Sequence, residues 1–300
     1  MKIIVTHMSP DWDAIGSVWL IKKFLPGWME AEVKFVPAGQ RLSNKKPSST
    51  TTKDPIEIIG DDEVIHVDTG LTPLDHHQTH DVNISASSLA WDYVRLEILK
   101  AGDSLTKEHI EAVSRIVKII VDTDHFKEVF WKDAKLDYHE FSLLGLLEGF
   151  KLEKPGKDSE YIKFGIECLN ALIHTFENRI WAEKEIKQKG VEFKTRHGLG
   201  MGFETLNDTV LKLAQKMGYV LVVRKDPRKG YVRIKALPST EGERGLDLTL
   251  AYEQLRKIDP DATWFLHISK KMLLNGTPKN PKMRPTKLSL GDIIKVLEKL

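Results

Sequence analysis

The chain has little cysteine, little net charge and no apolar run long enough for a membrane span. Cys168 is the only cysteine among its 300 residues, so an intrachain disulfide and a cysteine-rich zinc site are both excluded. No segment approaches the ~20 apolar residues of a membrane-spanning helix. The formal charge of +2 is too small to indicate a nucleic-acid coat or a membrane surface, so any electropositive patch must be local.

The composition and the first residues are those of an ordinary globular protein. Apolar residues make up 41% and charged residues 29% of the chain, which leaves little room for long disorder. Met1 leads directly into a strand-like stretch without the features of a secretory signal. We therefore expect a cytoplasmic protein with no membrane association. The length favours two domains.

Strand-like and helix-like patterns alternate in the first half of the chain. The expected strands are residues 2–6, 32–37 and 63–67, and the expected helices are residues 14–24, 85–101 and 106–121. Residues 41–55, rich in Ser, Thr, Lys and Pro, are typical of an exposed loop. For the third helix, Asp103, Ser104 and Thr106 are all candidate caps. The alternation predicts an α/β fold with a mostly parallel sheet flanked by helices, in which ligands gather at the carboxyl ends of the strands.

A long helical stretch near residues 159–189 divides the chain. We expect a catalytic domain over residues 1–155, a connector helix within 156–190 and a smaller α/β substrate-binding domain over 191–300. In the last part, the expected strands are 191–194, 219–224, 231–237 and 263–268, the expected helices are 208–217, 248–257 and one from about 290, and residues 197–202 are an expected glycine-rich turn.

Four clusters of acidic residues and histidines follow apolar segments of the first half. They comprise His7, Asp11 and Asp13; Asp68 in "HVDTG"; Asp75, His76 and His77 in "LDHHQTH"; and Asp122, Asp124 and His125 in "IIVDTDHF". The carboxylates are thus expected to converge on one edge of the sheet. Imidazole and carboxylate ligands without thiolates suit Mn²⁺, and by ligand type also Mg²⁺, Zn²⁺, Fe²⁺ or Co²⁺. Five or six ligands fit two ions better than one, and a pair of ions suits phosphoryl chemistry.

Each cluster also has a plainer interpretation. Asp11 or Asp13 alone would be explained by capping of the following helix, and His66 by a place in the core or on a strand face. Asp75 could be a turn residue, and residues 122–125 could cap the turn that follows them. The ordered series favours a site, because four coincidental clusters in one half of a chain, each at the end of an element, are improbable together.

The series "HMSPDWDAIGS", "VDTG", "LDHHQ" and "VDTDHF" resembles the DHH phosphoesterase family, which contains RecJ-like exonucleases, nanoRNases, cyclic-dinucleotide phosphodiesterases and family II pyrophosphatases. The resemblance covers roughly the first half of the chain. It implies that His7, Asp11 and Asp68 hold one ion and that Asp13, Asp68, His76 and Asp122 hold the other. Asp68 would then bridge the two ions. The resemblance further implies that His77 faces the phosphate and that Asp75 supports it.

Three features depart from the family pattern. Trp12 stands where a small residue is usual, either as a cover over the helix start or as a stacking face. Only six residues separate Asp68 from Asp75, and no Gly-Gly-Gly-His clamp occurs in the second half. The compressed spacing, "SASSLAWDYV" and the late "FLHISKKMLLNGT" are similar to the melanocyte-proliferating-gene family of DHH-like exonucleases, although the opening motif there usually differs.

Candidate substrate contacts lie in the second half. Arginine forks and backbone N–H groups of a glycine-containing loop are what phosphate recognition needs. The candidates are Arg224, Lys225, Arg228 and Arg233 on an expected hairpin, and His267, Lys270, Lys271, Gly276 and Arg284 farther along. Each of them alone could equally be a solvated surface residue. The run "TPKNPKMRPTK" is basic without aromatic residues, which favours phosphate contact over base stacking.

The sequence therefore predicts a two-metal phosphodiesterase, most simply an exonuclease or oligonucleotidase acting with Mn²⁺ on short or single-stranded nucleic acid. A pyrophosphatase or a cyclic-dinucleotide phosphodiesterase would use the same chemistry. A non-catalytic nucleotide-binding module that keeps the metals as a structural clip is the alternative from another class. The metal used in the cell, RNA or DNA preference, the polarity of degradation and the oligomeric state, a homodimer included, are left open.

Overall fold

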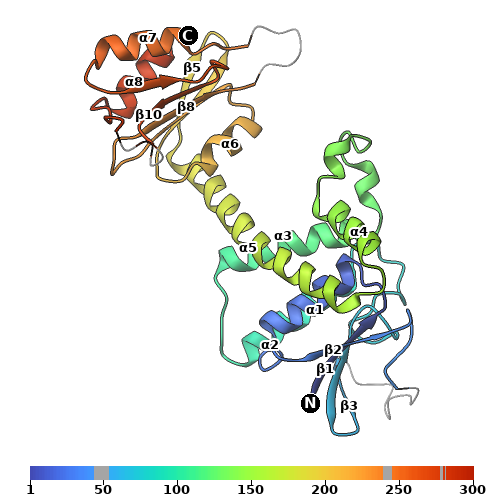
Figure 1. Cartoon of the computed structure of the whole chain (residues 1–300). Coiled ribbons are helices and arrows are strands. Elements are labelled where there is room, and N and C mark those ends of the chain that lie inside the picture. Colours follow the sequence, from blue (N-terminus) through green and yellow to red (C-terminus); the bar gives the residue numbers. More distant parts are fainter. Residues whose placement is uncertain (44–53, 239–244, 278–279, 281) are drawn as a thin grey trace. The chain divides into compact units, whose positions relative to one another are not determined.

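The computed structural model describes residues 1–43, 54–238, 245–277, 280 and 282–300. The chain forms two compact units, an N-terminal unit (Met1–Glu177) and a C-terminal unit (Asn178–Leu300). Each unit combines helices with a sheet (Figure 1), which confirms the predicted α/β class. Helix α5 (Asp158–Lys189) begins in the first unit and ends in the second. Among the described residues, no helix combines the length and apolar composition needed to cross a bilayer.

The sheet of the N-terminal unit is parallel except at one edge. Its strands are β1 (Lys2–His7), β2 (Glu32–Val36), β3 (Ile56–Ile59) and β4 (Asp62–His66), in the order β2-β1-β4-β3. Strand β1 is parallel to both of its neighbours, whereas β3 runs antiparallel to β4. The parallel strands are therefore as predicted, but β3 was missed. Residues 44–53 of the predicted loop 41–55 lie outside the described residues.

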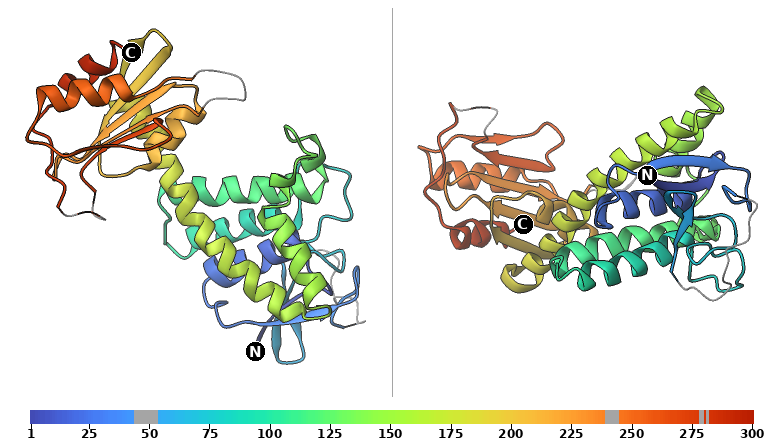
Figure 2. Two further views of the ribbon diagram at one scale, coloured as in Figure 1. Left: turned by 45° about the horizontal axis from the view of Figure 1, so that its top comes forward. Right: turned by 90° about the horizontal axis from the view of Figure 1, so that it is seen from below.

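Helices α1 to α4 and the first part of α5 belong to the N-terminal unit (Figures 1 and 2). Their bounds are α1 (Trp12–Phe24), α2 (Ala86–Lys100), α3 (Lys107–Asp124) and α4 (Leu143–Glu153). Helix α1 packs against both α2 and α3. Strand residues such as Ile4 and Ile65 join the helices in one apolar core, while Ile3 and Val64 point to the opposite face. At the start of α3, Thr106 is the cap, because its side chain accepts a hydrogen bond from His109 N.

The segment between α3 and α5 was not assigned any structure from the sequence. It contains two 3₁₀ turns (Lys127–Phe130 and Asp137–His139) before α4. Aromatic side chains of this segment are exposed, including Phe130 and Phe141. Short 3₁₀ turns carry little periodic signal, which explains why the pattern of apolar residues did not reveal them.

The C-terminal unit is built on a sheet with one parallel pair. The sheet runs β5-β6-β7-β8-β10-β9, with β6 and β7 parallel and the other neighbours antiparallel. Its strands are β5 (Val191–Thr195), β6 (Gly198–Glu204), β7 (Leu221–Lys225), β8 (Val232–Ala236), β9 (Trp264–Leu266) and β10 (Met272–Asn275), and its helices are α6 (Thr209–Lys216), α7 (Thr249–Ile258) and α8 (Leu290–Leu297).

The predicted glycine-rich turn at residues 197–202 is wrong. Most of it belongs to strand β6, which pairs with β5 on one side and β7 on the other. A Cβ on Gly200 would lie 2.4 Å from the ring of Phe193, and one on Gly202 would lie 2.9 Å from Ile294. The glycines therefore make room for side chains that pack across the strand, instead of bending the chain.

Candidate metal centre

The first ligand pair is placed by the passage from β1 into α1. His7 ends the strand, and Asp11 caps the helix, because its Oδ1 accepts hydrogen bonds from Asp13 N (2.9 Å) and Ala14 N (3.0 Å). The second carboxylate oxygen of Asp11 lies 3.9 Å from His7 Nε2. Capping and ligation therefore do not compete at this position, since each uses a different oxygen of Asp11.

Asp13 is buried and holds the start of α2. Its Oδ1 accepts hydrogen bonds from Ser85 Oγ (2.6 Å) and Ser87 N (2.8 Å), and its Oδ2 accepts one from Ala86 N (2.7 Å). The same Oδ2 lies 3.7 Å from His76 Nε2. The sequence predicts Asp13 as a ligand but misses this second task, which locks the carboxylate in place between two helix starts.

Asp68 lies at the centre of the cluster, two residues beyond the end of β4. Its φ of 54° is a left-handed conformation that Asp tolerates better than most residues. Its Oδ2 lies 3.2 Å from His7 Nε2 and its Oδ1 lies 3.5 Å from His76 Nε2. The two oxygens of this buried carboxylate therefore face two different groups of potential ligands, as a bridging ligand requires.

The structure brings Asp124 of α3 into this cluster and places the predicted ligand Asp122 beside two lysines instead. Asp124 Oδ2 lies 3.4 Å from His76 Nε2. Asp122 instead pairs with Lys118 at 2.7 Å and Lys127 at 3.2 Å. The physical reason is helical: two positions along, a residue lies on nearly the opposite face of a helix. Asp124 is four residues after the buried Ile120 and therefore continues the inward face.

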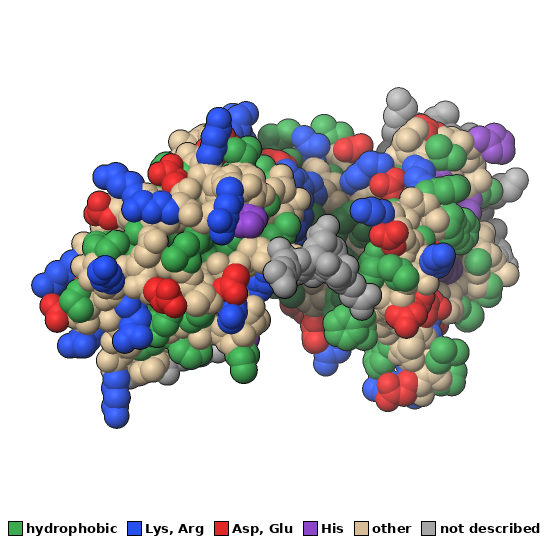
Figure 3. All heavy atoms as spheres, turned by 90° about the horizontal axis from the view of Figure 1, so that it is seen from above, with side chains coloured by type: hydrophobic (Ala, Val, Ile, Leu, Met, Phe, Trp, Pro, Cys, Tyr) green, Lys and Arg blue, Asp and Glu red, His purple; other side chains and the backbone are tan. Residues whose placement is uncertain are grey.

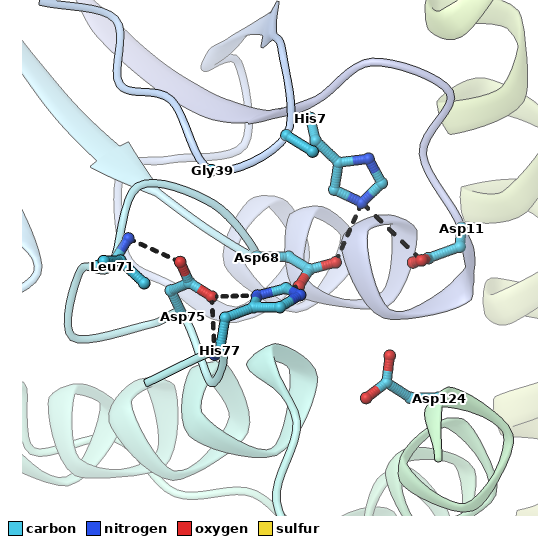
Figure 4. Close-up of a pocket in the computed structure, with 9 residues that line it drawn as sticks. His7, Asp11, Gly39, Asp68, Leu71, Asp75, His77 and Asp124 are labelled. Atoms are coloured by element: carbon cyan, nitrogen blue, oxygen red, sulfur yellow. Dashed lines mark hydrogen bonds and ion pairs between the residues drawn. The ribbon is translucent and has the colours of Figure 1, made fainter. Parts of the chain in front are cut away.

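Asp75 and His77 form a supported pair beside Asp68. Asp75 is buried, and its Oδ2 accepts a hydrogen bond from Leu71 N at 2.7 Å. Its Oδ1 lies 2.6 Å from His77 Nδ1. Figure 4 shows the His77 ring against Asp68, with its other nitrogen directed away from Asp75 into the pocket. A carboxylate that holds one ring nitrogen fixes the orientation of the other.

The donor set fits divalent cations. Three groups of side chains have ligand atoms within 4.8 Å of one another: His7, Asp11 and Asp68; Asp68, His76 and His77; and His76, Asp124 and His125. In the described part of the chain, three buried atoms of these groups have no hydrogen-bond partner: Asp68 Oδ1, His76 Nε2 and Asp124 Oδ2. Buried polar atoms are nearly always satisfied, so this cluster of unsatisfied atoms is what a site for cations would leave.

The pKa values show how strongly these groups interact. Burial lowers the pKa of His7, but the hydrogen bond to Asp68 and the charges of Asp11 and Asp68 together outweigh burial and raise the pKa to about 9. Contact with Asp68 and the charge of Asp124 raise the pKa of His76 to about 9. Burial, together with the charges of Asp68 and Asp124, raises the pKa of Asp13 to about 8. Without metal, the cluster therefore holds protons that a divalent cation would displace.

These groups line two hollows that we call the metal cleft. The first, of about 320 Å³, is lined by His7, Asp68 and Asp75 among others, and the second, of about 560 Å³, by Trp12, Asp13 and His76 among others. Asp11, His77 and Asp124 line both. The cleft is therefore continuous around the carboxylates and open to a ligand.

The predicted arginine contacts of the C-terminal unit are neighbours on adjacent strands. Arg224 on β7 lies opposite Arg233 on β8. Arg224 Nε lies 2.7 Å from Asp208 Oδ1, and Arg233 pairs with the other oxygen of Asp208. Burial lowers the pKa of Lys235, as do the charges of Arg233 and Lys212. This group of side chains therefore carries more positive than negative charge.

The other predicted contacts have partners of their own. His267 Nδ1 lies 2.8 Å from Ser269 Oγ, Lys270 lies 3.3 Å from Asp247, and Arg284 is exposed. Gly276 has a φ of 76°, and a Cβ there would lie 2.1 Å from the Tyr231 ring, so packing explains this glycine. Residues 278, 279 and 281 of the basic run lie outside the described residues. Figure 3 shows Lys and Arg interspersed with Asp and Glu on one face of this unit, with no continuous basic patch there.

The structural roles of Ser85 and Ser87 were not predicted from the sequence, and no role was predicted for His125. Ser87 also donates a hydrogen bond from Oγ to Asp13 O at 2.9 Å. His125 Nε2 lies 2.8 Å from Ile84 O and 3.8 Å from Asp124 Oδ2. The serine-rich "SASS" at the start of α2 was a usable signal, because a serine at a helix start can donate a hydrogen bond to a nearby carboxylate.

No protein-family model matches the sequence, and no curated protein does. Among solved structures, an uncharacterized protein from Helicobacter pylori G27 is 10% identical, with 99% of this chain and 98% of that one covered and a TM-score of 0.24. The pGpG-specific phosphodiesterase PggH from Vibrio cholerae is 13% identical (93% of each chain, TM-score 0.30). RecJ from Thermus thermophilus, in complex with Mg²⁺, is 11% identical (92% of this chain, 47% of that one, TM-score 0.28). Likeness at this level establishes neither family nor function.

Proposed function

We propose that this protein is a two-metal phosphoesterase of the DHH type that hydrolyses phosphodiester bonds of short or single-stranded nucleic acid. The observation that carries the proposal is the placement of Asp68. Its Oδ2 faces His7, with Asp11 close by, and its Oδ1 faces His76, with Asp124 close by. Two ions that share one carboxylate are the arrangement that in-line phosphoryl transfer uses.

Six groups would hold the ions, most simply Mn²⁺. His7, Asp11 and Asp68 would hold one ion, and Asp68, His76, Asp124 and Asp13 the other. Bound there, the ions would supply Lewis acidity, easing deprotonation of the attacking water and neutralising the charge that develops on the phosphoryl group. The buried Asp13, held by three hydrogen bonds from the start of α2, keeps one side of the site rigid.

His77 would bind the substrate phosphate. Asp75 accepts the Nδ1 proton of the ring, which leaves Nε2 directed into the cleft. An Nε2–H group in this position would donate to a phosphate oxygen, while Asp75 holds the ring through Nδ1. Asp75 acts through His77 and is therefore a positioning residue.

The C-terminal unit would contribute substrate contacts, as the proposed division into a catalytic domain, a connector helix and a substrate-binding domain requires. Arg224 and Arg233 share one carboxylate, Asp208, and Lys235 lies near enough to Arg233 for the two charges to interact. This excess of positive charge supports a phosphate contact. His267, Lys270, Gly276 and Arg284 remain part of the proposal.

The test is hydrolysis of a substrate panel by the purified protein with Mn²⁺. The panel comprises 5′- and 3′-labelled oligonucleotides, cyclic dinucleotides and pyrophosphate. We expect short oligonucleotides to be shortened stepwise, and Asp68→Asn to reduce the rate by at least a hundredfold because the bridge loses its charge. Asp122→Asn is the matched control, since Asp122 pairs with two lysines outside the cluster, and it should keep most of the activity.

The outcomes separate the alternatives. Turnover of pyrophosphate or cyclic dinucleotides alone would move the proposal to a small-substrate enzyme with the same chemistry. Metal binding without turnover of any substrate would indicate a binding module. Full activity of Asp68→Asn with two ions still bound would show that Asp68 does not bridge them.

A further inference from the structure

An apolar cavity opens beside the metal cleft within the N-terminal unit. It measures about 270 Å³ and is lined by side chains from the start of α1, from α3, from the segment before α4, from the start of α4 and from α5. Its aromatic walls are Trp12, Trp131 and Phe176, and most of the rest is aliphatic. Among the described residues that line it, none is charged, and Thr123 and Ser142 supply the hydroxyl groups.

The cavity and the cleft share part of their walls. Trp12, Thr123 and Leu144 line both spaces. Trp12 stands between Asp11 and Asp13, so the side chain that closes the cavity is covalently next to two proposed metal ligands. The cavity is therefore the space next to a phosphate bound in the cleft, where another part of the same ligand would lie.

The chemistry of the walls selects the occupant. A cavity without charge excludes a second phosphate, whereas aromatic faces suit a flat, largely apolar ring by stacking. The volume lies just below the ~300–1,000 Å³ typical of sites for drug-sized ligands, which suits one ring system better than a whole nucleotide. Figure 3 shows further hydrophobic side chains exposed on one face of this unit.

We propose that this cavity binds the nucleobase of the nucleotide whose phosphate lies in the metal cleft. The inference rests on the proposed function and names the part of the substrate that the N-terminal unit recognises. Few polar groups reach the cavity: Thr123 Oγ1 already donates to Ile120 O at 3.0 Å, and Ser142 Oγ accepts from Gly145 N at 3.4 Å. The cavity would therefore bind a base by stacking and distinguish little between different bases.

The test compares two ligands with the same phosphate and sugar, one with a base on C1′ and one with a hydroxyl group in its place. Binding of adenosine 5′-monophosphate and of ribose 5-phosphate to the Mn²⁺-loaded protein is measured by calorimetry. We expect the nucleotide to bind about tenfold more tightly, in line with the gain from stacking one base. Ile119 lines the cavity and is 41% exposed, so Ile119→Trp should fill the cavity without disturbing the core. It should remove the difference between the ligands and leave the affinity for ribose 5-phosphate unchanged.

Two further variants make the result decisive. Leu99→Trp adds the same ring to an exposed position of α2 outside the cavity and should keep the preference for the nucleotide. Trp131→Ala removes one aromatic wall without filling the space and should weaken only the nucleotide, with folding checked by circular dichroism.

Three results would overturn the inference. Equal affinities in the unmodified protein would show that the base is not bound, while the proposed function stands. A change of oligomeric state in Ile119→Trp, at unchanged affinities, would assign the cavity to a second copy of the chain. Absence of binding by both ligands would overturn the proposed function and this inference with it.

Discussion

Single residues of the N-terminal unit explain how the chain can gather so many charges in one place. Three carboxylates of the cluster have a partner that holds them: backbone N–H groups for Asp11 and Asp13, and His7 for Asp68. These contacts offset part of the cost of bringing like charges together. The atoms of the cluster that remain without a hydrogen-bond partner, Asp68 Oδ1, His76 Nε2 and Asp124 Oδ2, are buried and face one another. This arrangement differs from that of a cluster of exposed charges on a surface.

The assignment of Asp124 in place of Asp122 gives a paired prediction. Asp124→Asn should weaken Mn²⁺ binding at least tenfold, because a half-buried charged group that faces His76 is lost. Asp122→Asn should change it less than twofold, since Asp122 contacts Lys118 and Lys127 instead. Calorimetric titration of both variants with Mn²⁺ is the measurement. The reverse order of the two effects would restore the assignment suggested by the sequence.

His66 predicts a pH dependence of stability. It is fully buried, and burial together with the nearby charge of Arg41 lowers its pKa from 6.5 to about 4, although Glu57 opposes the shift. Between these values the unfolded chain binds one proton more than the folded protein, so the free energy of unfolding falls as the pH drops from about 6.5 to about 4. The loss between pH 7 and pH 5 should be about 2 kcal/mol.

His66→Gln tests this contribution, because the Gln carbonyl can still accept the hydrogen bond that His66 Nε2 accepts from Leu42 N. Denaturation by urea in the presence of a chelator should show a smaller acid-induced loss for the variant than for the unmodified protein. Identical losses in both proteins would mean that His66 does not titrate in this range.

At the scale of elements, two glycines within helices allow the effect of packing on stability to be compared with the effect of helix propensity. Gly165 in α5 faces α1, and a Cβ there would lie 2.3 Å from Ile15 Cγ2. Gly149 in α4 has no atom within 4 Å of the corresponding position among the described residues. The close approach of α5 to α1 therefore depends on Gly165, and this approach fixes the helix that carries Asp13.

Gly165→Ala should destabilise the protein by about 1–3 kcal/mol, because the clash outweighs the gain in helix propensity. Gly149→Ala should stabilise it by about 0.5–1 kcal/mol, since only the propensity changes. Thermal and chemical unfolding of the two variants check both signs. Stabilisation by Gly165→Ala would show that α5 can move away from α1 without cost.

At the scale of the whole chain, much of the fold and the cluster could be predicted from periodicity and order. Apolar runs predicted β1, β4 and the helices α1, α2 and α3, and the four clusters predicted most of the side chains that meet at one edge of the sheet. The resemblance to the family motif pointed to Asp122. The helical periodicity of α3, which places Asp124 on the inward face, was not applied to this choice. Strand β6 was read as a turn because its glycines serve packing partners, such as Phe193, that no local pattern reveals.

The central claim is that groups from four segments of the chain hold two divalent ions through Asp68. A crystal structure of the protein grown with Mn²⁺, with anomalous diffraction recorded at the manganese edge, tests it most directly. We expect two peaks about 3.5–4 Å apart, one on each side of the Asp68 carboxylate, with Asp124 contacting one of them. A single peak, or two peaks that Asp68 does not join, would contradict the account.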